Sequence, residues 1–263
     1  MKQVPLDLAR APTSSFENFY PGPNAKLIEM LQDALARLIP MANKANKANT
    51  APISGELAST PLESIFVCGD RGSGKTHLLH ACEQVAQGCG LEVVHWQVQG
   101  QGEGQGHIRA DSKVIHCPSD FKSQWRLMII DDVHLMNEAD QAFAFNWFVN
   151  ASAPGDHLRR MILMSADQHV SALAIRDDLR TRMAQGLCLE LKTLDEQACR
   201  AVLIEQAKLR GLALKGDVLD FMMTRFSRDL SNLVGWLDQL DAFSLRTQRA
   251  ITIPLIKDML NEL

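Results

Sequence analysis

Hydrophobic and polar residues follow two distinct patterns over the first two thirds of the chain. Short, continuous apolar runs predict buried strands, which we place at residues 65–68, 91–97, 127–130, 161–164 and 187–191. Between these runs, apolar residues recur at intervals of three and four, which predicts helices over residues 75–87 and 139–149. Strands that alternate with helices are typical of a parallel sheet covered on both faces. The pattern therefore predicts an α/β fold with a mostly parallel five-stranded sheet.

The last quarter of the chain shows helical spacing alone. Its apolar residues predict helices over residues 195–210, 216–226, 229–246 and 254–262. One more predicted helix, over residues 24–39, precedes the first strand, whereas the first twelve residues carry two prolines and no helical period. We therefore predict three parts, which are an extended N-terminal arm over residues 1–12, an α/β domain over 13–191 and a small all-helical domain over 192–263.

Composition and charge argue against several classes of protein. The chain has 263 residues, of which 46% are hydrophobic and 22% charged, and its net charge of −4 gives no general attraction to nucleic acid. No apolar run approaches the roughly 18 residues that span a membrane, and the first residues lack the apolar core of a secretory signal. The six cysteines and the histidines show no metal-ligand spacing, so we interpret the cysteines as reduced thiols. These features predict a cytoplasmic protein without a membrane partner.

A glycine-rich segment between the first strand and the next helix fits the pattern G-x-x-x-x-G-K-[ST] of phosphate-binding loops. It consists of Gly69, Asp70, Arg71, Gly72, Ser73, Gly74, Lys75 and Thr76. Glycines let backbone N–H groups surround phosphates, and a helix N-terminus adds a favourable field for their negative charge. We expect Lys75 to contact the β and γ phosphates and Thr76 to coordinate Mg²⁺. The segment predicts a site for ADP or ATP with Mg²⁺ and leaves open which nucleotide is the working ligand.

Acidic and polar residues end two of the predicted strands. Asp131 and Asp132 follow the apolar run 127–130. We expect Asp131 to hold the Mg²⁺ shell and Asp132 to be the catalytic base that orients water. Because Asp is one methylene shorter than Glu, we expect weak intrinsic ATP hydrolysis. Ser165 and Asp167 follow the next strand, where a polar side chain can sense the nucleotide's γ-phosphate, and a simple strand-end turn is the alternative.

A charged segment precedes the last predicted strand. Residues 177–182 read Asp-Asp-Leu-Arg-Thr-Arg, and in a ring-forming ATPase an arginine at such a place reaches a neighbour's γ-phosphate. The alternative is a solvated charged turn. The helical domain that follows holds ten Lys or Arg and ten Asp or Glu, so it lacks the basic surface of a DNA-binding module. We therefore expect no direct, sequence-specific DNA binding.

These motifs, in this order, resemble the AAA+ ATPases of the DnaA group. Residues 15–24 are similar to the segment that opens the ATPase domain of this group and touches the adenine side of the nucleotide. Residues 175–186 resemble the arginine-finger box, which places the catalytic finger on Arg182. The segment 237–254 is similar to the Hda branch of the group. The resemblance covers residues 3–263 and implies an AAA+ domain followed by a helical lid.

What the resemblance implies is a regulator of the initiation of chromosomal replication. Members of the Hda branch dock on the DNA-loaded sliding clamp, the β subunit of DNA polymerase III, and stimulate ATP hydrolysis by DnaA, which prevents re-initiation. Gln3, Leu6 and Leu8 are similar to the clamp-binding peptide of that branch, and an arm that packs on its own domain or is disordered is the alternative. The group also carries a sensor arginine on a lid helix, where this chain has Ser231, with Arg228 three residues earlier. The implied partners are DnaA and the clamp, and a homodimer stays open.

Two other functions stay open at this point. An ATP-driven helicase loader or remodeller of the DnaC type would use the same phosphate loop and acidic pair for its own turnover. An origin-binding initiator is a further alternative, against which the balanced charge of the helical domain argues. Clamp binding without robust turnover would favour the regulator, whereas turnover stimulated by single-stranded DNA would favour the loader.

Overall fold

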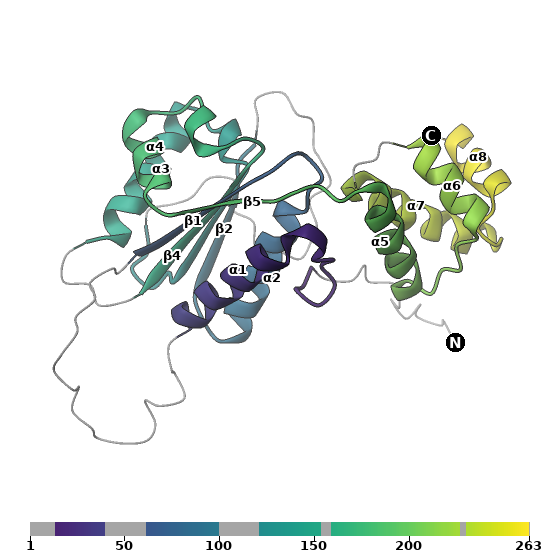
Figure 1. The fold of residues 1–263 in the computed structure, drawn as a ribbon, viewed down its shortest axis with the longest axis horizontal. Helices are drawn as coiled ribbons and strands as arrows, with labels where there is room; N and C mark the ends of the chain where they lie inside the picture. Colours follow the sequence, from purple (N-terminus) through teal and green to yellow (C-terminus); the bar gives the residue numbers. More distant parts are fainter. Residues whose placement is uncertain (1–13, 40–61, 100–120, 154–158, 227–229, 263) are drawn as a thin grey trace, which may run out of the picture. The chain divides into compact units, whose positions relative to one another are not determined.

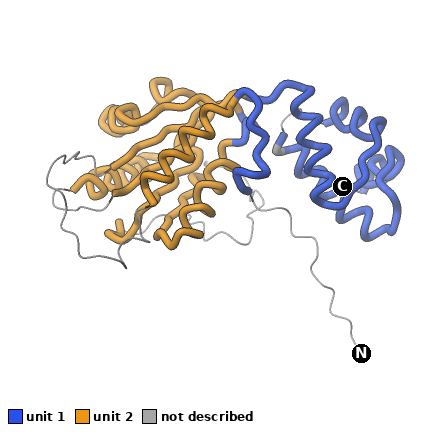
Figure 2. The backbone as a smooth tube through the Cα atoms, turned by 60° about the horizontal axis from the view of Figure 1, so that its bottom comes forward, with its two compact units in different colours: residues 1–23, 71–74, 193–263 blue, residues 24–70, 75–192 orange. Residues whose placement is uncertain are grey.

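The computed structural model describes most of the chain (Figure 1). The described residues are 14–39, 62–99, 121–153, 159–226 and 230–262. The predicted arm with Gln3, Leu6 and Leu8 lies outside them, as does Arg228. Figure 2 shows two compact units, one of residues 24–70 and 75–192, the other of residues 193–263 with 71–74 and the chain up to 23. No helix in the described ranges is long and apolar enough to cross a membrane.

Five parallel strands form the sheet of the larger unit. They are β1 (Leu62–Cys68), β2 (Val93–Gln97), β3 (Leu127–Asp131), β4 (Arg160–Ala166) and β5 (Leu187–Glu190). The strand order is β2-β3-β4-β1-β5, and each neighbouring pair runs parallel. Because all strands run the same way, their carboxyl ends lie at one edge of the sheet, which is where ligands bind in such folds. The predicted parallel α/β fold is confirmed.

Helices cover both faces of this sheet (Figure 1). Helices α1 (Ala25–Leu38) and α2 (Lys75–Gly88) lie on one face, and α3 (Glu138–Ala151) and α4 (Asp177–Ala184) lie on the other. All residues of β3 and β4 are buried, as expected for central strands with both faces covered. Single 3₁₀ turns lie at Gly22–Asn24, Val133–Leu135 and Val170–Ala172. The loops at the carboxyl edge of the sheet are therefore supported by a buried, well-packed core.

Helix α4 covers the charged segment before the last strand, for which the sequence predicted no helix. Leu179 and Met183, four residues apart on one face of the helix, are fully buried. Asp177 and Asp178 lie in its first turn and Arg182 in its last, where their charges suit the helix dipole. Two apolar residues in a short charged stretch are too few to predict a helix, and packing of that face against the core supplies the missing stabilisation.

The smaller unit contains the helices predicted for the end of the chain. They are α5 (Glu196–Leu209), α6 (Gly216–Arg225), α7 (Leu230–Thr247) and α8 (Ile253–Glu262). Their apolar faces meet in one core, in which Leu203, Met222 and Leu237 are fully buried. After α5 the chain turns at Gly211, whose φ of +71° is the left-handed conformation that ends many helices. The predicted all-helical domain is confirmed.

Gly186→Ala is expected to lower the free energy of unfolding by about 1–3 kcal/mol, which is the usual cost of inserting a methyl group into a packed core. A Cβ on Gly186 would lie 2.1 Å from the backbone carbonyl oxygen of Ser64 in β1, and backbone cannot move aside easily. Urea unfolding measures the change. The matched control is Gly88→Ala at the end of α2, where an added Cβ meets nothing within 4 Å. Equal stability of the two variants would contradict the expected clash.

Candidate nucleotide-binding site

The phosphate loop connects the end of β1 to the start of α2. Gly72 and Gly74 have φ values of +79° and +101°, in the left-handed region that favours glycine. A Cβ on Gly74 would also lie 2.9 Å from the ring of Phe19, which comes from the N-terminal segment that resembles the opening of the DnaA ATPase domain. The loop conformation and its neighbour thus both require glycine at position 74. Gly69 donates its backbone N–H to the carbonyl oxygen of Ala166 in β4, at 3.2 Å.

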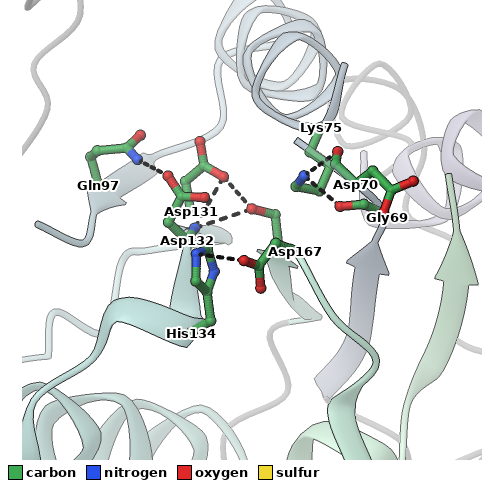
Figure 3. Close-up of polar contacts among 9 residues, drawn as sticks. Gly69, Asp70, Lys75, Gln97, Asp131, Asp132, His134 and Asp167 are labelled. Atoms are coloured by element: carbon green, nitrogen blue, oxygen red, sulfur yellow. Dashed lines mark hydrogen bonds and ion pairs between the residues drawn. The ribbon is translucent and has the colours of Figure 1, made fainter. Parts of the chain in front are cut away.

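Lys75 and Ser73 carry polar groups that suit a phosphate. Nζ of Lys75 donates to the carbonyl oxygens of Gly69 and Asp70, at 2.7 and 2.9 Å, so its ammonium lies against the loop (Figure 3). The Lys75 side chain is buried. The buried hydroxyl of Ser73 has no hydrogen-bond partner in the described structure. A loop with a buried ammonium and an unpartnered hydroxyl fits the phosphates of a nucleotide.

Asp131 is the centre of the polar cluster at the carboxyl end of β3 (Figure 3). Its side chain is fully buried, and its Oδ2 accepts a hydrogen bond of 2.7 Å from the hydroxyl of Thr76. Its Oδ1 accepts from the hydroxyl of Ser165 and from the backbone N–H of Asp132, the latter at 3.1 Å. The structure thus brings together Thr76 and Asp131, the pair expected to hold Mg²⁺. A carboxylate beside a threonine hydroxyl is the donor set of a magnesium shell completed by phosphates and water.

Asp132 adopts a left-handed conformation, with φ +59° and ψ +46°, immediately after the strand. Its Oδ2 accepts a hydrogen bond of 2.7 Å from the side chain of Gln97, at the end of β2 (Figure 3). Burial, and then the charge of Asp131, raise the pKa of Asp132 to about 6. A carboxylate with a pKa close to neutrality is suited to exchanging a proton with water. Gln97 was not predicted, although the register opposes it to Asp131.

The two residues expected to sense the nucleotide, Ser165 and Asp167, form contacts with different residues. Ser165 is buried in β4, where its hydroxyl donates to Asp131 and accepts the backbone N–H of Asp132 at 3.1 Å. Ser165 therefore orients the acidic pair in this structure. Asp167 lies beyond the strand, and its Oδ2 is 3.4 Å from Nε2 of His134, a further residue that the sequence did not indicate (Figure 3).

The segment before the first long helix is fastened to the chain that enters the lid. The Asn24 side chain donates to the carbonyl oxygen of Lys192 at 2.9 Å and accepts its backbone N–H at 2.8 Å. Asn24 is buried, so this pair of hydrogen bonds is shielded from water. The asparagine at the predicted helix start therefore holds this segment to the chain that follows β5.

Arg182 lies on α4 against an aromatic ring. Its guanidinium carbon is 4.9 Å from the ring centroid of Phe145, and that of Arg176 is 5.4 Å from the same centroid. Arg176 pairs with Asp178 at 2.6 Å, and Arg180 pairs with the neighbouring Asp177. Within the described part of the chain, no carboxylate forms an ion pair with Arg182. The aromatic face holds this guanidinium without neutralising its charge.

Two profiles of known protein families match this chain. Residues 11–190, which are 180 of the 263 residues, match the profile of the bacterial DnaA ATPase domain. The chain belongs to the DnaA ATPase family. Residues 182–260 of this DnaA-type protein match the profile of the Hda lid domain. The predicted membership of the AAA+ ATPases of the DnaA group, on the Hda branch, is confirmed, and the chain is a member of a DnaA-related family of replication regulators.

Similar proteins include one full-length relative and several solved structures. An uncharacterized protein of Haemophilus influenzae is 27% identical over 266 residues, covering 99% of each chain. Domain III of the replication initiation protein DnaA from Thermotoga maritima superposes with a TM-score of 0.65 at 18% identity, covering 95% of this chain and 97% of that one. AMPPCP-bound DnaA from Aquifex aeolicus superposes with a TM-score of 0.59 at 20% identity, covering 91% and 68%. These structural likenesses establish the fold.

Proposed function

We propose that this DnaA-type protein binds ADP or ATP with Mg²⁺ and stimulates ATP hydrolysis by DnaA. It would do so docked on the DNA-loaded sliding clamp, and the loss of ATP-bound DnaA would prevent re-initiation. The observation that carries the proposal is Arg182, whose charge lies on a helix surface without an acidic partner among the described residues. A DnaA-type domain joined to an Hda-type lid supports DnaA as the partner.

Nucleotide binding rests on the loop and the acidic cluster together. Lys75 and the buried Ser73 hydroxyl supply groups for the phosphates, and Thr76 with Asp131 supplies oxygen ligands for Mg²⁺. When bound, Mg²⁺ supplies charge neutralisation for the phosphates. The Aquifex aeolicus DnaA that shares this fold is described with AMPPCP bound, which supports the same class of ligand here.

The regulatory step needs an arginine that acts on a neighbouring molecule. A guanidinium stabilises the charge that develops on the transferred phosphoryl group, and its planar fork matches phosphate oxygens. Arg182 is the residue that we assign to this step, with Phe145 holding its guanidinium. Docking on the clamp is assigned to Gln3, Leu6 and Leu8.

Phosphate release from ATP-bound DnaA tests the proposal. Purified DnaA is loaded with ATP and mixed with this protein and with the sliding clamp on primed DNA. We expect rapid hydrolysis when all components are present and slow hydrolysis when either this protein or the clamp is left out. The same slow rate in every mixture would contradict the proposed function.

A helicase loader of the DnaC type is the second candidate. It is favoured by the complete set of Thr76, Asp131 and Asp132, because a carboxylate with a pKa of about 6 beside a magnesium pair permits intrinsic turnover. Turnover by the protein alone decides between the two. Strong hydrolysis stimulated by single-stranded DNA would favour the loader, and weak hydrolysis that DNA does not change would favour the regulator.

Lys75→Ala is expected to weaken nucleotide binding by about 2–3 kcal/mol, the value of a lost charge-assisted contact. That is roughly 30- to 150-fold in the dissociation constant. Titration calorimetry with ADP and with ATP, each with Mg²⁺, measures it. Lys26→Ala on α1 is the control, because this lysine side chain is 82% exposed and pairs only with Glu29 among the described residues. Unchanged nucleotide affinity of the Lys75→Ala variant would contradict the assignment of Lys75 to the phosphates.

The protein alone is expected to show no sequence-specific binding to duplex DNA. Its net charge is −4, and the residues from 192 onward hold as many acidic as basic side chains, so few phosphates could be neutralised. A mobility-shift assay over a series of salt concentrations measures this. A specific shift that resists salt would contradict the expectation.

A further inference from the structure

Two histidines and a glutamate form a cluster between α2 and β2, apart from the residues assigned above. His80 and Glu83 lie one turn apart on α2, and His95 lies in β2. Oε2 of Glu83 is 2.7 Å from Nδ1 of His95 and 3.2 Å from Nδ1 of His80. One ligand atom from each of the three residues lies within 4.8 Å of the other two.

The two separations measured from Glu83 are close to those of a tetrahedral metal site. Zinc binds imidazole nitrogen at about 2.0–2.1 Å and carboxylate oxygen at about 2.0–2.2 Å, so neighbouring ligand atoms stand roughly 3.3 Å apart. The two distances from Oε2 of Glu83 differ from that value by roughly 0.1 and 0.6 Å. Side-chain movements of less than about 1 Å would therefore let His80, Glu83 and His95 share one ion.

The surroundings of the cluster suit a metal ligand set. The His95 side chain is 1% exposed, and its Nε2 has no hydrogen-bond partner in the described structure, so its only polar contact points into the cluster. The Glu83 side chain is 10% exposed, so the carboxylate that faces the two rings is also largely shielded from solvent. Two imidazoles and a carboxylate that converge in this way are the donor set of a catalytic-type zinc site.

A neighbouring glutamine orients the carboxylate of the cluster, and one of the two histidines is open to solvent. The side chain of Gln87 donates a hydrogen bond of 3.0 Å to Oε1 of Glu83, which leaves Oε2 directed at the two rings. A hydrogen bond from a neighbouring side chain fixes the orientation of a metal-binding carboxylate. The His80 side chain is 19% exposed, so an ion can enter from solvent and keep a water as its fourth ligand.

We propose that His80, Glu83 and His95 bind one divalent transition-metal ion, with zinc as the ion that best fits two imidazoles and a carboxylate. The ion would fasten α2, which begins at the phosphate loop, to β2. His95 and Gln97 are two residues apart in β2 and so point to the same face, and Gln97 contacts Asp132. Bound metal would thereby stiffen the strand that positions the acidic pair.

Zinc titration of the full chain, freed of metal by a chelator, tests this site. Calorimetry is performed with excess Mg²⁺, so that Mg²⁺ competes at the oxygen ligands of Asp131. We expect one saturable zinc ion per chain and a rise in melting temperature, because zinc bound to the folded state stabilises it. His80→Ala is expected to weaken zinc affinity by about 100-fold or more, since even outer-shell partners contribute about 10- to 100-fold. His169→Ala, which removes an exposed histidine far along the chain, should leave the zinc affinity unchanged.

Glu83→Gln keeps the test decisive if His80→Ala fails to fold. This variant preserves the shape of the side chain but removes its charge, and we expect it to lose the zinc-induced rise in melting temperature. Absence of saturable zinc binding by the natural sequence would overturn the proposal. Unchanged zinc affinity in a folded Glu83→Gln or His80→Ala variant would overturn it as well, and leave a hydrogen-bonded cluster without a metal.

Discussion

Arg182→Ala is expected to lower the stimulated hydrolysis of DnaA-bound ATP by about 10³-fold or more, the usual contribution of an arginine finger. The guanidinium of Arg182 lies over Phe145 with no acidic partner among the described residues, so its charge is available to a phosphate of another molecule. Single-turnover phosphate release from ATP-bound DnaA, with the clamp on DNA, measures the effect. The variant's own nucleotide affinity should be unchanged, because Arg182 contacts neither the phosphate loop nor Asp131 in the described structure.

Two further variants distinguish the specific role of an arginine finger from a general effect of removing a positive charge. Arg176→Ala removes the other guanidinium over Phe145 and changes the net charge equally, and we expect it to keep most of the stimulation. Arg182→Lys keeps the charge but loses the planar fork, so we expect it to recover little activity. Normal stimulation by Arg182→Ala, or an equal loss in Arg176→Ala, would rule out the assignment.

Removal of residues 1–8 is expected to abolish binding to the sliding clamp. The pattern Q-x-x-L-x-L places Gln3, Leu6 and Leu8 where an amide can make one fixed polar contact and two leucines can fill apolar pockets. Pro5 favours an extended chain and so lowers the entropy lost on binding. Burial of both leucines contributes about 3–5 kcal/mol before the cost of association, or at least about 100-fold in affinity. Surface plasmon resonance on immobilised clamp measures the loss.

Two further variants of the N-terminal arm, one expected to lose clamp binding and one expected to keep it, serve as controls for the deletion. Leu6→Ala combined with Leu8→Ala should reproduce the deletion, whereas Val4→Ala, which shortens an apolar residue at a variable position of the pattern, should bind normally. Nucleotide affinity and melting temperature should stay the same in all variants. Full clamp affinity after the deletion would show that the arm is not the docking segment, and loss of nucleotide binding would show that it is structural.

Most of the candidate site could be predicted because its signals are local in the sequence. The phosphate loop is a continuous motif at a strand-to-helix turn, and an acidic pair directly after an apolar run marks the end of a buried strand. A parallel sheet then requires that the ends of β1, β3 and β4 meet at one edge, so Thr76 and Asp131 were expected to approach although 55 positions separate them.

Other parts of the site depend on register and could not be predicted. Gln97 reaches Asp132 because β2 pairs with β3 in the register that opposes Gln97 to Asp131, and a shift by one residue would turn its side chain to the other face. The charged segment of α4 carries too few apolar residues to indicate a helix. The hydroxyl of Ser165 orients the acidic pair because β3 and β4 are neighbours in the sheet, an adjacency that strand order alone decides.

The sequence by itself determined the alternation of strands and helices, the phosphate loop and the all-helical end of the chain, because periodicity and glycine placement act over a few residues. Only the tertiary structure decided which distant side chains come together and how far each of them is buried. The pKa of Asp132 is raised to about 6 because folding partly buries it beside Asp131, and His95 meets Glu83 because β2 lies against α2. Burial and long-range contacts arise from the packing of elements, which no local pattern of residues records.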